Sequence, residues 1–126
     1  MREITFSEAL GEAILEEMER DPTIFTYGED IAKQGGIFGA YKSLLGKFPD
    51  RVFDTPISEE AIYGSALGAA LVGMRPVVEF HFADFLFTGI QSITLQIEKM
   101  RYMTGGQGKL HLVLRGPDGV AQSAAA

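Results

Sequence analysis

Asp54-Thr55-Pro56-Ile57-Ser58-Glu59 runs directly into a segment of small residues, Gly64 to Gly73, and this stretch decides the fold. The polar residues predict a loop, and the alanines and glycines after them predict a helix with an almost smooth surface. Glu59 lies in the first turn of that helix, where the helix dipole favours a carboxylate. Its position alone therefore favours a capping role over catalysis, and Glu60 fits that role better still. The stretch is either a cofactor site or a tight helix contact.

Helical and extended segments alternate on both sides of this stretch. A four-residue spacing of apolar positions predicts a first helix, capped by Ser7 and ended by Asp21-Pro22. Further helices are expected over residues 41–48 and 85–103, and strands over residues 23–27, 51–53, 76–80 and 110–114. Such alternation is typical of an α/β fold in which helices flank a parallel sheet.

Composition limits the class of protein. The 126 residues are enough for one domain, which we assign to residues 1–126, and 46% of them are hydrophobic, which is enough for a core. The net charge of −6 argues against non-specific binding of nucleic acid. The absence of cysteine excludes disulfides and thiolate metal sites, and neither a signal peptide nor a membrane span is expected. These features predict a cytoplasmic domain.

The end of the chain differs from the rest. After the strand expected at residues 110–114, only a short tail rich in glycine and alanine follows, and no helix returns to the sheet. We therefore expect the domain to be truncated at its C-terminus.

Two further places could carry chemistry. Glu29 follows an expected strand, at the edge where α/β sheets place their ligands, although a loop acid or helix cap is the more common explanation. The run from His81 to Phe87 contains three phenylalanines and could line a pocket for a flat ring, although core packing is more usual. His81 and His111 have no metal-ligand partners at a recognised spacing, and no phosphate-binding loop ends in Gly-Lys-Ser/Thr.

Taken together, the motifs resemble the β subunit of the thiamine-diphosphate-dependent 2-oxo acid dehydrogenases, the E1 component. The resemblance covers nearly the whole chain. The residues that carry it are Gly28-Glu29-Asp30, Gly35-Gly36-Ile37-Phe38-Gly39, Asp54 to Glu59, Gly73 to Phe80, Phe82-Ala83-Asp84-Phe85, Arg101 to Gly106 and Arg115-Gly116-Pro117. It implies the pyrimidine-binding fold of thiamine enzymes.

The resemblance also implies roles for single residues. Glu59 would hydrogen-bond the cofactor's aminopyrimidine ring and share a proton with it, as the catalytic acid. Its neighbours in the same site are expected to be Ile57, Ser58, Glu29, His81 and Phe85, with Phe85 as the stacking face. Phe82, Ala83, Asp84 and Phe85 are expected to border the substrate, and the backbone carbonyl of Leu112 to bind a potassium ion.

The implied activity is decarboxylation of a 2-oxo acid, pyruvate or a branched-chain acid, followed by acyl transfer to a lipoyl-bearing E2. The implied assembly is a heterotetramer, in which an E1 α subunit holds the diphosphate with Mg²⁺ and a second β subunit completes the enzyme. A Gln-His-Ser sequence that the family places after an alanine-rich stretch like Ser123 to Ala126 is absent. The alternatives are an acetoin dehydrogenase, a transketolase-like enzyme, or a non-catalytic fragment that binds an α subunit and is inactive when isolated.

Overall fold

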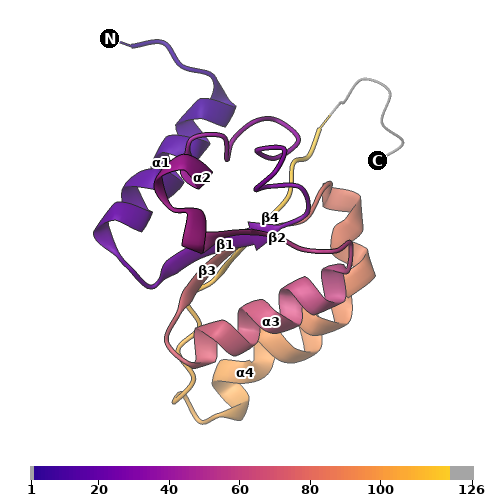
Figure 1. The fold of residues 1–126 in the computed structure, drawn as a ribbon. Coiled ribbons are helices and arrows are strands. Elements are labelled where there is room, and N and C mark those ends of the chain that lie inside the picture. The colour runs from indigo at the N-terminus through magenta and orange to yellow at the C-terminus, as the bar shows by residue number, and fades with distance from the viewer. Residues whose placement is uncertain (1, 120–126) are drawn as a thin grey trace.

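The computed structural model describes residues 2–119 and shows one parallel sheet with helices on both faces (Figure 1). The strand order is β2-β1-β3-β4, and every neighbouring pair is parallel. The predicted α/β architecture is therefore confirmed. In chain order the elements are α1 (Phe6–Arg20), β1 (Ile24–Gly28), α2 (Leu44–Lys47), η1 (Pro49–Arg51), β2 (Val52–Asp54), α3 (Glu59–Leu71), β3 (Arg75–Glu79), η2 (Ala83–Gly89), η3 (Ser92–Ile97), α4 (Glu98–Met103) and β4 (Val113–Arg115).

The strand register places four residues in one row across the carboxyl end of the sheet. Gly28 of β1 pairs with Asp54 of β2 on one side and with Glu79 of β3 on the other. Glu79 pairs in turn with Arg115 of β4. The loops that leave these strands start from this edge, which is where ligands bind in open α/β sheets.

The core has two parts, one on each face of the sheet. Helices α1 and α2 cover one face, and α3 and α4 cover the other (Figure 1). Met18, Tyr41 and Leu44 are central to the first part, and Tyr63 and Val78 to the second. Coverage of both faces is the rule for parallel sheets, because their crossover connections place helices on the faces.

Helix α1 is capped by Thr5, so the prediction that Ser7 caps it is wrong. The Thr5 hydroxyl accepts a hydrogen bond from the Glu8 backbone N–H at 3.2 Å, and the Glu8 carboxylate accepts one from the Thr5 N–H at 2.8 Å. This reciprocal pair needs a glutamate three residues after the cap, which Thr5 has. Ser7 lies inside the helix and donates to the Phe38 carbonyl at 2.5 Å instead.

The single helix predicted over residues 85–103 is a chain of three different helical segments. Residues 83–89 form a 3₁₀-helix, residues 92–97 a π-helix, and only residues 98–103 a separate α-helix. The Thr88 and Thr94 hydroxyls donate to the carbonyls of Phe85 and Ile90, at 2.7 and 2.9 Å, which competes with regular helical pairing. Gly89 also packs directly on the Tyr63 ring, where a Cβ atom would overlap.

The small-residue helix α3 packs against β3 and against the η2 and η3 segments. Ile62, Tyr63 and Ala66 are buried, whereas a Cβ atom added at Gly68 would meet no atom within 4 Å. The segment that follows β3 therefore supplies part of the close contact expected along this helix. A contact of its Gly68 side with another chain stays a prediction.

The last strand is shorter than predicted, since β4 begins at Val113 and not at residue 110. The short alanine-rich tail on which the expectation of truncation rested lies largely outside the described residues. Across residues 2–119, no helix is both long enough and apolar enough to span a membrane.

Arg51 ties the end of α1 to the first strand, and its replacement should cost stability. Its guanidinium donates to the carbonyls of Met18, Asp21 and Ile24 at 2.9 to 3.2 Å and lies 4.1 Å from the centre of the Phe48 ring. Lysine offers a single ammonium group with no planar face. We expect Arg51→Lys to lower the free energy of unfolding by about 1–2 kcal/mol, measured by urea denaturation.

Arg20→Lys is the matched control for this measurement. Arg20 is exposed and pairs only with Glu17, one helical turn away, so its replacement should change stability little. Equal unfolding midpoints for the two variants would contradict the assignment of Arg51 as a clamp.

Candidate functional site

Acidic groups gather at the carboxyl edge of the sheet, on the loops that follow the strands. Gly28 lets β1 approach β3 closely, because a Cβ atom there would overlap the Glu79 carbonyl oxygen. The Asp54 carboxylate accepts hydrogen bonds from the backbone N–H groups of Ala32 and Lys33, at 2.7 and 3.2 Å. The loop after β1 is thus fixed to the end of β2, and Glu29 is held at its start.

Glu59 is buried, unlike an ordinary acid in the first turn of a helix. It is the first residue of α3 and only 8% exposed, whereas its neighbour Glu60 is exposed and accepts a hydrogen bond from Ser92 at 2.5 Å. Buried carboxylates are rare in proteins unless they are paired or functional. Burial therefore argues against a simple capping role for Glu59. Such a role still fits the exposed Glu60.

Glu29 is buried beside Glu59. It is 2% exposed, and neither of its carboxylate oxygens has a hydrogen-bond partner of good geometry. Burial is the main cause that raises the pKa of Glu29, and the nearby Glu59 raises it further. The His81 imidazole and the backbone N–H groups of His81 and Ser58 act in the opposite direction but do not outweigh burial.

His81 completes this group, because its ring lies between two carboxylates. Its Nδ1 is 3.1 Å from Glu29 Oε2, and its Nε2 is 3.5 Å from Asp30 Oδ2. Burial also raises the pKa of Tyr63, with Glu59 and Glu29 as the next causes, so the tyrosine lies within electrostatic reach of both acids. The structure thus brings together Glu29, Glu59 and His81, three of the predicted site residues.

The aromatic run after β3 lies against the same group. The His81 and Phe82 ring centres are 6.2 Å apart, and those of Phe82 and Phe85 are 6.3 Å apart in an edge-to-face arrangement. The Tyr63 hydroxyl donates to the Phe85 carbonyl at 3.3 Å, and the Ala83 N–H donates to the Pro117 carbonyl at 2.9 Å. Phe85 is about one-third exposed, so its ring retains accessible surface.

The remaining residues predicted to contact the cofactor or substrate are half-buried or exposed. Ile57 is 75% exposed and Asp84 is exposed as well. The Ser58 hydroxyl donates to the Pro56 carbonyl at 3.2 Å and makes no capping bond to α3. The contacts of Ile57, Ser58 and Phe85 with a cofactor, and of residues 82–85 with a substrate, stay predictions.

A buried charged cluster that was not predicted from the sequence lies beside this site. Arg115 forms an ion pair with Glu79 and donates to the Tyr41 hydroxyl at 2.9 Å. Glu79 and Tyr41 are almost completely buried. The three residues are far apart in sequence, and only the strand order places Glu79 next to Arg115, so no local signal could have revealed the cluster.

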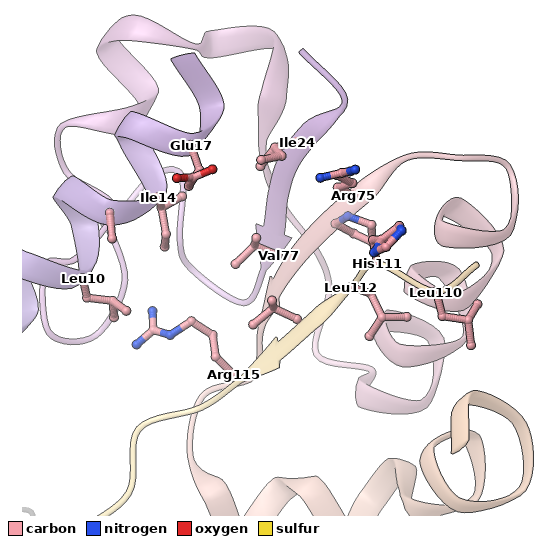
Figure 2. A pocket seen from close by; sticks show the side chains of 13 residues that line it. Leu10, Ile14, Glu17, Ile24, Arg75, Val77, Leu110, His111, Leu112 and Arg115 are labelled. Atoms are coloured by element: carbon pink, nitrogen blue, oxygen red, sulfur yellow. The ribbon is translucent and has the colours of Figure 1, made fainter. Parts of the chain in front are cut away.

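A separate apolar groove of about 560 Å³ lies between α1 and the strands β3 and β4 (Figure 2). Leu10 and Ile14 of α1 and Val77 of β3 line it, with Arg75, His111 and Arg115 among the charged or titratable residues of its lining. Leu112 is the only predicted site residue in this lining, so the groove is distinct from the acids at the sheet edge. The potassium ion expected at the Leu112 carbonyl stays a prediction.

The fold and the site together define a class: an open α/β domain with buried acids at the carboxyl edge of its parallel sheet, where ligands bind in such folds. Residues 2–126 match the family described as "Transketolase, pyrimidine binding domain". The chain belongs to this family.

The chain is also similar to the β subunits of two 2-oxo acid dehydrogenases. The chain is 44% identical over 125 residues to the pyruvate dehydrogenase E1 component subunit beta of Rickettsia felis, a match that covers 98% of this chain and 38% of that protein. It is 40% identical over 120 residues to the 2-oxoisovalerate dehydrogenase subunit beta of Bacillus subtilis, covering 94% and 37%. The chain thus spans less than half the length of the curated relatives it matches. The predicted resemblance to E1 β subunits is confirmed.

A solved structure supports the same fold. A split-gene transketolase, described as an inactive beta4 tetramer, superposes with a TM-score of 0.54 at 26% sequence identity. The match covers 85% of this chain and 31% of that one.

Proposed function

We propose that this chain supplies the pyrimidine-binding part of an E1 β subunit, in an enzyme that decarboxylates a 2-oxo acid with thiamine diphosphate. The acid is pyruvate or a branched-chain 2-oxo acid, and the acyl group passes to a lipoyl-bearing E2. The observation that carries this proposal is the burial of Glu59 in the first turn of α3, beside a second buried acid, Glu29. The E1 β relatives support the reaction type.

The side chains at this edge fit an aminopyrimidine ring. Such a ring offers polar groups at its rim and two flat faces. Glu59 and Glu29 supply buried polar atoms, and neither oxygen of Glu29 makes a hydrogen bond of good geometry within residues 2–119. Ile57 and Phe85 supply accessible apolar surface. When bound, thiamine diphosphate provides the electron sink that decarboxylation of a 2-oxo acid requires.

Glu59 would hold a proton against a ring nitrogen of the cofactor. A carboxylate does this best in a dry, fixed position, since bulk water would compete for the same proton. The raised pKa of Glu29 means that Glu29 retains its proton more readily than an exposed glutamate.

We assign the diphosphate and Mg²⁺ to an E1 α subunit, because this sequence has no phosphate-binding loop of the Gly-Lys-Ser/Thr type. Within residues 2–119, no three side chains of His, Asp or Glu gather in a way that could hold a metal ion. A second β subunit would complete the heterotetramer. The exposed side of α3 is one surface available for these contacts.

A transketolase-like reaction is the second candidate, favoured by the solved transketolase that shares the fold. The two candidates differ in products, because a 2-oxo acid dehydrogenase releases CO₂ and a transketolase transfers a ketol group between sugar phosphates. The test is to assemble this chain with an E1 α subunit and assay both reactions with thiamine diphosphate. The 2-oxo acids to assay are pyruvate and 3-methyl-2-oxobutanoate.

We expect cofactor-dependent release of CO₂ from at least one of these acids and no ketol transfer. Ketol transfer without CO₂ release would contradict the proposal and support the transketolase-like alternative. A stable complex with neither activity would support the non-catalytic alternative.

A further inference from the structure

The backbone N–H groups of His81 and Ser58 favour the charged form of Glu29 but do not offset the effect of its burial. Glu29 is 2% exposed, and neither oxygen makes a hydrogen bond of good geometry with the described residues. A buried carboxylate left in this state is strongly disfavoured, because it has lost water without gaining a replacement. The neighbouring Glu59 adds repulsion.

His81 is the side chain placed to interact with the Glu29 carboxylate. Its two ring nitrogens face two different carboxylates, Glu29 at 3.1 Å and Asp30 at 3.5 Å. The imidazole therefore lies between the two acids, with one nitrogen toward each. Asp30 has a positive φ of 55°, unusual for a residue other than glycine, and its carbonyl accepts from the Gly36 N–H at 3.0 Å. Asp30 is thus fixed in place on the far side of the ring.

The backbone that carries His81 is fixed as well. Phe80, directly before it, donates its N–H to the Arg115 carbonyl at 3.0 Å, and Glu79 pairs with the Arg115 guanidinium. Tyr41, buried under the glycine loop, accepts from that guanidinium at 2.9 Å. The charged groups around the imidazole are therefore Glu29 and Asp30 after β1, and Glu79 of β3 with Arg115 of β4 behind it.

We propose that His81 is a positioning residue, whose imidazole bridges Asp30 and Glu29 and so holds the Glu29 carboxylate beside Glu59. The inference deepens the proposed function and rests on it for the role of Glu59. It gives His81 an effect exerted through Glu29 and not through contact with the cofactor. The bridge involves only residues of this chain, so it can be tested without a partner subunit.

The test is a titration of the Glu29 carboxyl group by ¹³C NMR in this chain, with Glu29→Gln used to identify its signal. A cation beside a carboxylate favours the charged form, so its removal raises the pKa of that carboxylate. We expect His81→Gln to raise the pKa of Glu29 further, on the order of one unit. His81→Lys keeps a cation and should restore most of the difference.

His111→Gln is the matched control, because His111 is exposed and precedes β4, away from the carboxyl edge of the sheet. His81→Asn serves as a second variant if circular dichroism shows that His81→Gln does not fold. An unchanged Glu29 midpoint in folded His81→Gln or His81→Asn would overturn the proposal. The titration requires no partner, cofactor or substrate, so its result is independent of whether the assembled protein decarboxylates a 2-oxo acid.

If His81 positions Glu29, the His81→Gln variant of the assembled enzyme should have a lower kcat, with little change in the KM for the 2-oxo acid. The His81→Lys variant should regain most of the lost kcat. A loss confined to KM would contradict the positioning role and point to direct contact with the substrate.

Discussion

Glu59→Gln should lower the rate of 2-oxo acid decarboxylation by about 100- to 10,000-fold in the enzyme assembled with an E1 α subunit. Glutamine has nearly the same shape as glutamate and can still form hydrogen bonds, but it cannot take up or release a proton. Glu59 is buried at the first residue of α3, where a carboxylate is shielded from bulk water. The measurement is CO₂ release at saturating thiamine diphosphate and 2-oxo acid.

Glu60→Gln is the control for this substitution. Glu60 follows Glu59 directly, is exposed, and only accepts a hydrogen bond from Ser92, which glutamine can also accept. We expect near-normal activity from this variant. If Glu59→Gln kept wild-type activity, or if both variants lost activity equally, the role assigned to Glu59 would be refuted.

Gly28→Ala should cost about 3 kcal/mol of stability and disturb the acid site at the same time. A Cβ atom at Gly28 would overlap the carbonyl oxygen of Glu79 on the neighbouring strand. Because the obstacle is backbone and not a movable side chain, β1 and β3 would have to separate at the carboxyl edge. Glu29 follows directly and would move with them. Urea denaturation followed by circular dichroism measures the loss.

Gly46→Ala is the matched control. Gly46 lies in the short helix α2, and a Cβ atom there would meet no atom within 4 Å. Alanine has the higher helix propensity, so this variant should be stabilised by about 0.5–1 kcal/mol. Equal stability of the two alanine variants would contradict the close approach of β1 to β3.

The alternation of helices and strands was sufficient to predict the parallel sheet, because each segment kept its own periodicity. Tertiary contacts, in contrast, determine where the helical segments begin and end and which type of helix each one forms. One helix was predicted over residues 85–103, yet the segment divides into 3₁₀, π and α parts. Gly89 packs on Tyr63 there, and the hydroxyls of Thr88 and Thr94 bond to backbone carbonyls. The Thr5 cap, by contrast, was readable from its glutamate three residues later.

The sequence singled out residues that the structure places together, but it did not reveal how they pair. Motif and position singled out Glu59, Glu29 and His81, and the structure brings all three together. That Glu29 is buried without a hydrogen bond, and that His81 lies between Glu29 and Asp30, depends on the course of the loop after β1. The Glu79–Arg115 pair depends on strand order, because 36 residues separate its two members.

The central claim is that Glu59 holds the proton that activates the cofactor. The most direct measurement is the rate at which the hydrogen at C2 of thiamine diphosphate exchanges with D₂O, compared between the assembled wild-type and Glu59→Gln proteins by NMR. The account predicts that exchange in Glu59→Gln is slower by about 100-fold or more. Equal exchange rates in the two proteins would contradict it.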